Sequence, residues 1–197
     1  MARLAFQDRV FTRKPSAPTK INLEALRADL IESWQPAASK KDISILFDVD
    51  ERVLSVHSHK ALLTESLRLF VGHAINHTSI DVISVTMTPF RIKDKDFIRA
   101  QISDEGDGLA SFDPRLSPGD VLPDLHVGID DSDKQAFAAS TAIMAINGAG
   151  GRFESEATPG FGHVLTFDLP ATLLAGADEP HTPTNIIEFK KGTANDG

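Results

Sequence analysis

The chain has 197 residues, of which 41% are hydrophobic, so it is long enough for one domain with a sizeable core. It contains no cysteine, which excludes disulfides and thiolate metal sites. A formal net charge of -8 opposes binding to nucleic acid through bulk electrostatics. The sequence shows neither a secretion signal nor an apolar run of about 18 residues. We therefore expect a cytoplasmic protein that binds neither nucleic acid nor a membrane.

The N-terminal part of the chain consists of a basic arm and a predicted helix. Residues 1–20 are basic, contain two prolines and have no helical or strand period, which predicts an arm or linker. From Ile21 to Trp34 apolar residues recur at helical spacing. Asn22 is a candidate N-cap, and Pro36 predicts an end or a kink of this helix.

The middle of the chain alternates between strand and helix patterns. Residues 42–58 alternate between apolar and polar side chains and are rich in β-branched residues, which predicts two short strands. Helical spacing returns from His59 to about Asn76. Residues 80–106 alternate twice around a charged turn, which predicts an antiparallel hairpin.

The C-terminal part begins with a long segment without a period. Residues 105–133 are rich in Gly, Pro and Asp, as is typical of a functional lid or of disorder. A small-residue helix is predicted over 134–147, followed by a hairpin that turns at Pro159 and Gly160. Residues 173–197 are predicted to be a disordered tail.

This order of elements predicts one α+β domain over residues 21–172. We expect a two-layer α/β sandwich, in which the helices cover one face of a mostly antiparallel mixed sheet.

A candidate binding motif lies at the end of the predicted hairpin. Asp104 ends the alternating segment and is followed by Gly106 and Gly108. An aspartate at a strand end offers a fixed carboxylate acceptor, and the glycines let a planar ligand approach the backbone closely. An exocyclic amine would satisfy this carboxylate. Asp and Gly also build ordinary acidic turns, so the motif alone leaves both interpretations open.

Taken together, the motifs resemble those of the catalytic and ATP-binding domain of sensor histidine kinases, in the GHKL (Bergerat-fold) ATPase superfamily. The likeness covers about Ile21 to Pro170. The sequence "ISDEGDGLA" is similar to the G1 box of that family. The resemblance implies that Asp104 receives the adenine amino group and that Gly106 and Gly108 form the turn beside it.

Two further segments carry the resemblance. The sequence "GAGGRFESEATPGFGHVLTFDLP" looks like the closing segment of the family, and Thr166 stands where the family's Thr supports the adenine site. The sequence "LTESLRLFVGHAINHT" lies where the N box is expected. The resemblance places His73 and Asn76 of this segment at the nucleotide.

The same segments depart from the family pattern in the phosphate half of the pocket. His73 stands where the family has the Asn that holds Mg²⁺, and Leu69 stands at a second Asn position. Mg²⁺ prefers oxygen ligands in octahedral geometry. Asn76 replaces a basic residue, and Ala136–Ala139 align with the glycine-rich lid motif. The resemblance thus implies ATP as the nucleotide, bound weakly if the phosphate half is lost, and leaves Mg²⁺ open.

Two functions follow from the resemblance. None of the histidines is followed by Glu or Asp, as a phosphoacceptor histidine usually is, so we expect no phosphoacceptor domain in this chain. The first function is an ATP-binding domain of a two-component kinase, acting with a dimerisation and phosphotransfer domain or a response regulator. The alternative is an inactive pseudo-ATPase that docks on a kinase or response regulator. His73 and His77 have i, i+4 spacing but no H-E-x-x-H pattern, so we predict no metal site. We also predict no catalytic residue in this chain.

Overall fold

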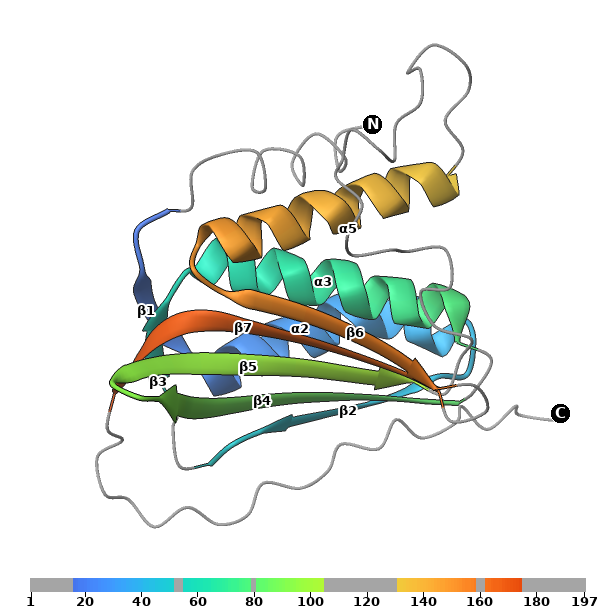
Figure 1. The fold of residues 1–197 in the computed structure, drawn as a ribbon. Helices are drawn as coiled ribbons and strands as arrows, with labels where there is room; N and C mark the ends of the chain where they lie inside the picture. Colours follow the sequence, from blue (N-terminus) through green and yellow to red (C-terminus); the bar gives the residue numbers. More distant parts are fainter. Residues whose placement is uncertain (1–15, 52–54, 79–80, 105–130, 159–161, 175–197) are drawn as a thin grey trace, which may run out of the picture.

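The computed structural model describes residues 16–51, 55–78, 81–104, 131–158 and 162–174. Within these ranges the chain forms two layers, with three helices on one face of a seven-stranded sheet (Figure 1). The predicted α+β sandwich is therefore confirmed. No helix in the described ranges is both long enough and apolar enough to cross a membrane.

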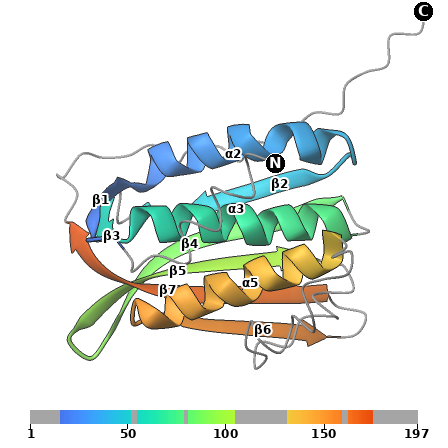
Figure 2. The same cartoon turned by 90° about the horizontal axis from the view of Figure 1, so that it is seen from above.

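The helices form one layer. They are α2 (Leu23–Ser39), α3 (Lys60–His77) and α5 (Asp131–Gly148). Figure 2 shows α3 lying between α2 and α5. Asn22 is the N-cap of α2, as predicted, because its side-chain oxygen accepts a hydrogen bond of 2.8 Å from the backbone N–H of Ala25.

The sheet has the order β1-β3-β7-β5-β4-β2, and β6 also pairs with β7. All described pairings are antiparallel except that of β2 with β4. The predicted hairpin is thus confirmed as the pair β4 and β5. The strands are β1 (Thr19–Asn22), β2 (Ser44–Val49), β3 (Ser55–Ser58), β4 (Val82–Ile92), β5 (Lys95–Asp104), β6 (Arg152–Thr158) and β7 (Gly162–Leu174).

The core lies between the helices and the sheet. Alternate residues of each strand point toward the helices, and these positions are apolar and buried along most of β5 and β7. Phe70 of α3 packs on Phe167 of β7 and Phe153 of β6, with ring centroids 5.9 and 5.3 Å apart. These contacts fix α3 over the strands that carry the candidate site.

The C-terminus of α5 brings the chain back into the sheet through two glycines. The backbone N–H of Gly151 donates to the carbonyl of Ile146, and that of Gly150 donates to the carbonyl of Asn147, both at 2.9 Å. Gly150 has φ of +81°, so the helix ends in a Schellman motif. A Cβ on Gly151 would clash with the backbone oxygen of Asp168. The positive φ of Gly150 and the close approach of Gly151 to β7 therefore both favour glycine at this helix end.

Several element boundaries differ from the predicted ones. The first helix continues past Pro36, because Trp34 and Ala38 on either side of it are both buried against the core. Helix α5 begins at Asp131, inside the segment predicted as a lid. Strand pairing also extends the sheet beyond the predicted ends. Residues 19–20 belong to β1, and residues 173–174 belong to β7.

Candidate functional site

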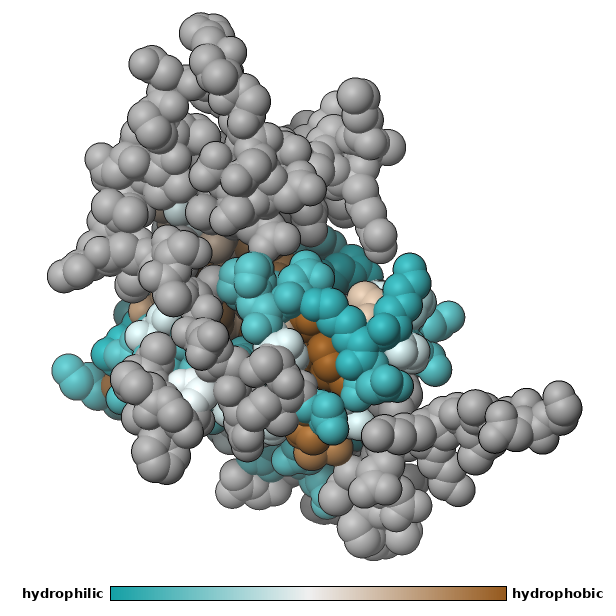
Figure 3. All heavy atoms as spheres, turned by 90° about the vertical axis from the view of Figure 1, so that its right-hand side faces the viewer, coloured by the Kyte–Doolittle hydropathy of each residue, from teal (hydrophilic) through white to brown (hydrophobic). Residues whose placement is uncertain are grey.

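The candidate site lies at one end of the sandwich. Figures 1 and 2 show that the end of β5, the start of β7, the end of α3 and the start of α5 meet there. Figure 3 looks onto this end, where hydrophilic residues surround a small hydrophobic area among the residues that are coloured. Asp104, the last residue of β5, therefore sits where the carboxyl end of a core strand meets a helix end.

Asp104 belongs to a row of polar side chains that crosses three strands. In the antiparallel ladder it lies directly opposite His163, the second residue of β7. Both side chains are buried, with 8% of Asp104 and 3% of His163 exposed. On β6, the hydroxyl oxygen of Ser155 lies 2.8 Å from Nε2 of His163. The row thus runs from β6 through β7 to β5 on the side of the sheet that faces the helices.

The charge state of His163 follows from its burial. Burial lowers the pKa of His163 below its ordinary value, and the nearby Asp104 carboxylate opposes this shift only in part. The imidazole is therefore neutral at neutral pH. A neutral ring beside a carboxylate leaves this end of the sheet with an acceptor-rich character, which suits a ligand that donates hydrogen bonds.

The end of α3 contributes a pair of imidazoles. His73 and His77 stack, with ring centroids 4.1 Å apart and an angle of 26° between the planes. The side chain of Asn76 is exposed, whereas its backbone carbonyl accepts a hydrogen bond of 2.8 Å from Nζ of Lys41. The same ammonium also donates to the carbonyl of Ile75 at 2.9 Å. Lys41 therefore caps the C-terminus of α3 and places a positive charge at the negative end of the helix dipole.

The structure does not place Thr166 next to Asp104. Thr166 pairs with Gln101 on β5 and with Glu154 on β6. Because side chains alternate along a strand, a residue opposite Gln101 lies on the other face from a residue opposite Asp104. His163, and not Thr166, lies opposite Asp104. Strand alternation alone could not identify it, because the choice depends on the register between β5 and β7.

The remaining predicted site residues are divided between the helix and the segment after β5. His73 and Asn76 lie in the last turns of α3, as expected from the helical period. Gly106 and Gly108, together with most of the lid-like segment, lie outside the described residues. Ala139, in the segment aligned with the glycine-rich motif, is buried within α5.

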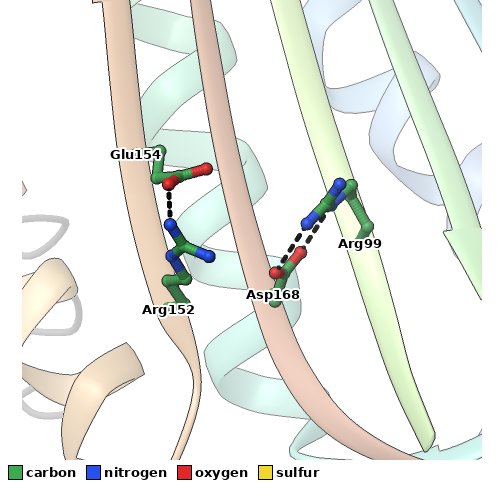
Figure 4. A network of polar contacts seen from close by, with 4 residues as sticks. All are labelled: Arg99, Arg152, Glu154 and Asp168. Carbon is green, nitrogen blue, oxygen red and sulfur yellow. Dashed lines mark hydrogen bonds and ion pairs between the residues drawn. The ribbon is translucent and has the colours of Figure 1, made fainter. Parts of the chain in front are cut away.

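The outer face of the sheet carries a separate polar network. Figure 4 shows the guanidinium of Arg99 on β5 facing the carboxylate of Asp168 on β7, with Arg152 and Glu154 alongside on β6. The Arg99–Asp168 pair is bidentate, at 2.8 and 2.9 Å. The Arg99 guanidinium also lies 4.7 Å from the ring centroid of Phe90. This network joins strands and lies on the opposite face from Asp104.

The end of α3 carries two imidazoles where the resemblance implies a ligand of Mg²⁺. The position expected to supply an oxygen ligand carries the imidazole of His73, which stacks on a second imidazole. Mg²⁺ requires oxygen ligands and rarely accepts imidazole. Among the described residues, no three His, Asp or Glu side chains come together as a metal site.

The comparisons with known proteins identify the fold. No family model matches the sequence, and no curated protein sequence matches it. Solved structures of histidine kinases do match. Full-length ShkA in complex with AMPPNP is 21% identical, with a TM-score of 0.63, and the match covers 88% of this chain and 36% of ShkA. This chain therefore spans roughly a third of the ShkA chain.

Two further structures have the same fold. The catalytic domain of the histidine kinase ThkA, in a nucleotide-free form, is 17% identical with a TM-score of 0.57, and the match covers 79% of this chain and 98% of that domain. The cytoplasmic segment of the histidine kinase QseC is 12% identical with a TM-score of 0.55, with 89% and 94% covered. The chain has the fold of histidine kinase catalytic, ATP-binding domains.

Proposed function

We propose that this chain is an adenine-nucleotide-binding domain of the histidine kinase type that acts on, or with, a partner chain. The partner class is a kinase dimerisation and phosphotransfer domain or a response regulator. We place this activity in the cytoplasm, where the QseC segment of the same fold is located. The observation that carries the proposal is the position of Asp104 at the helix-facing end of β5.

The carboxylate of Asp104 suits the exocyclic amine of adenine. It is acceptor-only when ionised, and a buried charged acceptor forms stronger hydrogen bonds than an exposed one. The ShkA structure of the same fold contains AMPPNP, an adenine nucleotide analogue. These two observations support ATP or ADP as the ligand of this chain.

The α3 donors favour a binding role over efficient phosphoryl transfer. Phosphoryl transfer depends mainly on positioning and on compensation of the phosphate charge, usually by a metal ion. His73 and His77 provide no oxygen ligand for Mg²⁺. We therefore propose weak nucleotide binding that depends little on Mg²⁺ and regulates the partner.

Calorimetric titration of the whole chain with ATP and ADP, each with and without Mg²⁺, tests this function. We expect both nucleotides to bind with similar affinity in either condition. Asp104→Asn should remove binding, because an amide presents a donor as well as an acceptor to the adenine amine. Asp48→Asn is the matched control, since Asp48 is an exposed strand aspartate on β2.

The outcomes separate the candidate functions. Absence of binding to both nucleotides overturns the proposal and leaves the inactive docking domain, which the imidazole pair on α3 favours. Micromolar ATP binding that requires Mg²⁺ contradicts the regulatory role and indicates a competent kinase domain. Equal binding by the wild type and Asp104→Asn contradicts the assigned pocket.

A further inference from the structure

We propose that His163 is a positioning residue of the nucleotide site, which orients Asp104 and thereby sets the preference for adenine. This inference rests on the proposed function. It concerns a residue that the sequence motif did not indicate, because the motif pointed to Thr166 on the other face of the sheet.

The first support is the cross-strand geometry. His163 and Asp104 are register partners in neighbouring antiparallel strands. Side chains of such partners lie on the same face with Cβ atoms about 5 Å apart, so each restricts the rotamers of the other. Both are buried among core residues, which limits their alternatives further. A change at His163 therefore acts on the Asp104 carboxylate directly.

The second support is that His163 is itself fixed. Its Nε2 lies 2.8 Å from the Ser155 hydroxyl oxygen, and its ring is almost entirely buried. A hydrogen bond at one ring nitrogen restricts the orientation of the ring. Gly162, immediately before it, has φ of +97°, a conformation that L side chains rarely adopt. The chain therefore enters β7 in a geometry that delivers the imidazole to one place.

The third support is electrostatic. Burial lowers the pKa of His163, so the ring beside Asp104 is neutral at neutral pH. A negative acceptor favours the amine of adenine and repels the carbonyl oxygen that hypoxanthine carries at the same position. His163 thus holds the Asp104 carboxylate in the place that distinguishes these two bases.

ADP and inosine diphosphate are the probes for this effect, since inosine diphosphate carries a carbonyl oxygen in place of the exocyclic amine and a proton on the neighbouring N1. Affinities of the whole chain for both are measured by calorimetry at neutral pH. In His163→Ala we expect ADP binding to weaken by about tenfold or more, while inosine diphosphate binding changes by less than about twofold. The preference for ADP should therefore fall.

Two gentler variants and a control complete the test. His163→Gln can still reach Ser155 and should retain most of the preference. Ser155→Ala removes only the hydroxyl that fixes the ring and should lower the preference by a smaller factor than His163→Ala. Ser103→Ala is the control, because Ser103 precedes Asp104 on β5 and pairs with Val164, on the outer face.

Each outcome decides the matter. Equal loss of both nucleotides in a folded His163→Ala protein indicates a structural role only and overturns the inference. So does unchanged ADP binding, while the proposed function survives. If the wild type binds ADP but not in preference to inosine diphosphate, the inference fails alone. If the wild type binds neither, both proposals fail. Should His163→Ala not fold, Ser155→Ala and His163→Gln decide by the same criteria.

Discussion

Arg99 and Asp168 face one another across β5 and β7 and form a bidentate ion pair on the outer face of the sheet. The side chains differ in exposure, with 40% of Arg99 and 7% of Asp168 accessible to solvent. The pair therefore joins a solvated cation to a buried anion. Removing Arg99 leaves the buried Asp168 carboxylate without a counter-charge, whereas removing Asp168 leaves a guanidinium that water still solvates.

We expect Arg99→Met to destabilise the fold by about 1–3 kcal/mol. The substitution leaves the buried Asp168 carboxylate without an ion-pair partner, while methionine preserves the packing of the apolar part of the arginine side chain. Asp168→Asn should cost less, because the amide oxygen still accepts and the guanidinium remains hydrated. Urea denaturation measures both. Arg152→Met is the control, because its partner Glu154 and Arg152 itself are exposed, and we expect a change within about 0.5 kcal/mol. Equal costs at Arg99 and Arg152 would contradict this account.

The glycines after α5 provide a second prediction. Gly151→Ala should destabilise the fold by about 3 kcal/mol or more, because the new Cβ would clash with the backbone oxygen of Asp168 and lie 2.9 Å from that of Ile146. Gly148→Ala meets nothing within 4 Å and should be neutral or stabilising by up to about 1 kcal/mol. Thermal unfolding of the two variants compares them directly. A tolerated Gly151→Ala would show that α5 does not approach β7 this closely.

The lowered pKa of His163 predicts a dependence of stability on pH. Because burial depresses this pKa in the folded state, the unfolded chain binds more protons below about pH 6.5. The contribution of neutral His163 to the free energy of unfolding is thus complete above that pH and is lost as the pH falls below it. Urea denaturation at pH 7.5 and 5.5 should show a smaller loss of stability for His163→Gln than for the wild type. A larger loss of stability for the variant than for the wild type would contradict the assigned direction of the pKa shift.

Thr166 offers a test of the register. Its side chain lies on the outer face with Gln101 and Glu154, so Thr166→Val should change ADP affinity by less than about twofold. The measurement is the same calorimetric titration that tests Asp104→Asn. If Thr166→Val lost binding as severely as Asp104→Asn, the position indicated by the motif would be correct and the register of β5 with β7 would be wrong.

The sequence determined the elements and their class, because these depend on local patterns. The period of two predicts the β4–β5 hairpin, and the period of 3.6 predicts α2 and α3, since burial of one face imposes those periods. Asp104 could be placed at a strand end for the same reason. The ends of the helices did not follow from local patterns alone. Pro36 remains inside α2 because tertiary packing of its neighbours outweighs the cost of one lost backbone hydrogen bond.

The tertiary structure alone decided which residues meet. The two strands within 42–58 join different partners, with β2 beside β4 and β3 between β1 and β7. Register between distant strands is set by hydrogen bonds across the sheet, and a shift of one residue exchanges the two faces. That register places His163 beside Asp104 and Thr166 on the far side. The identity of the site's second buried residue is therefore a property of strand pairing, which no local pattern encodes.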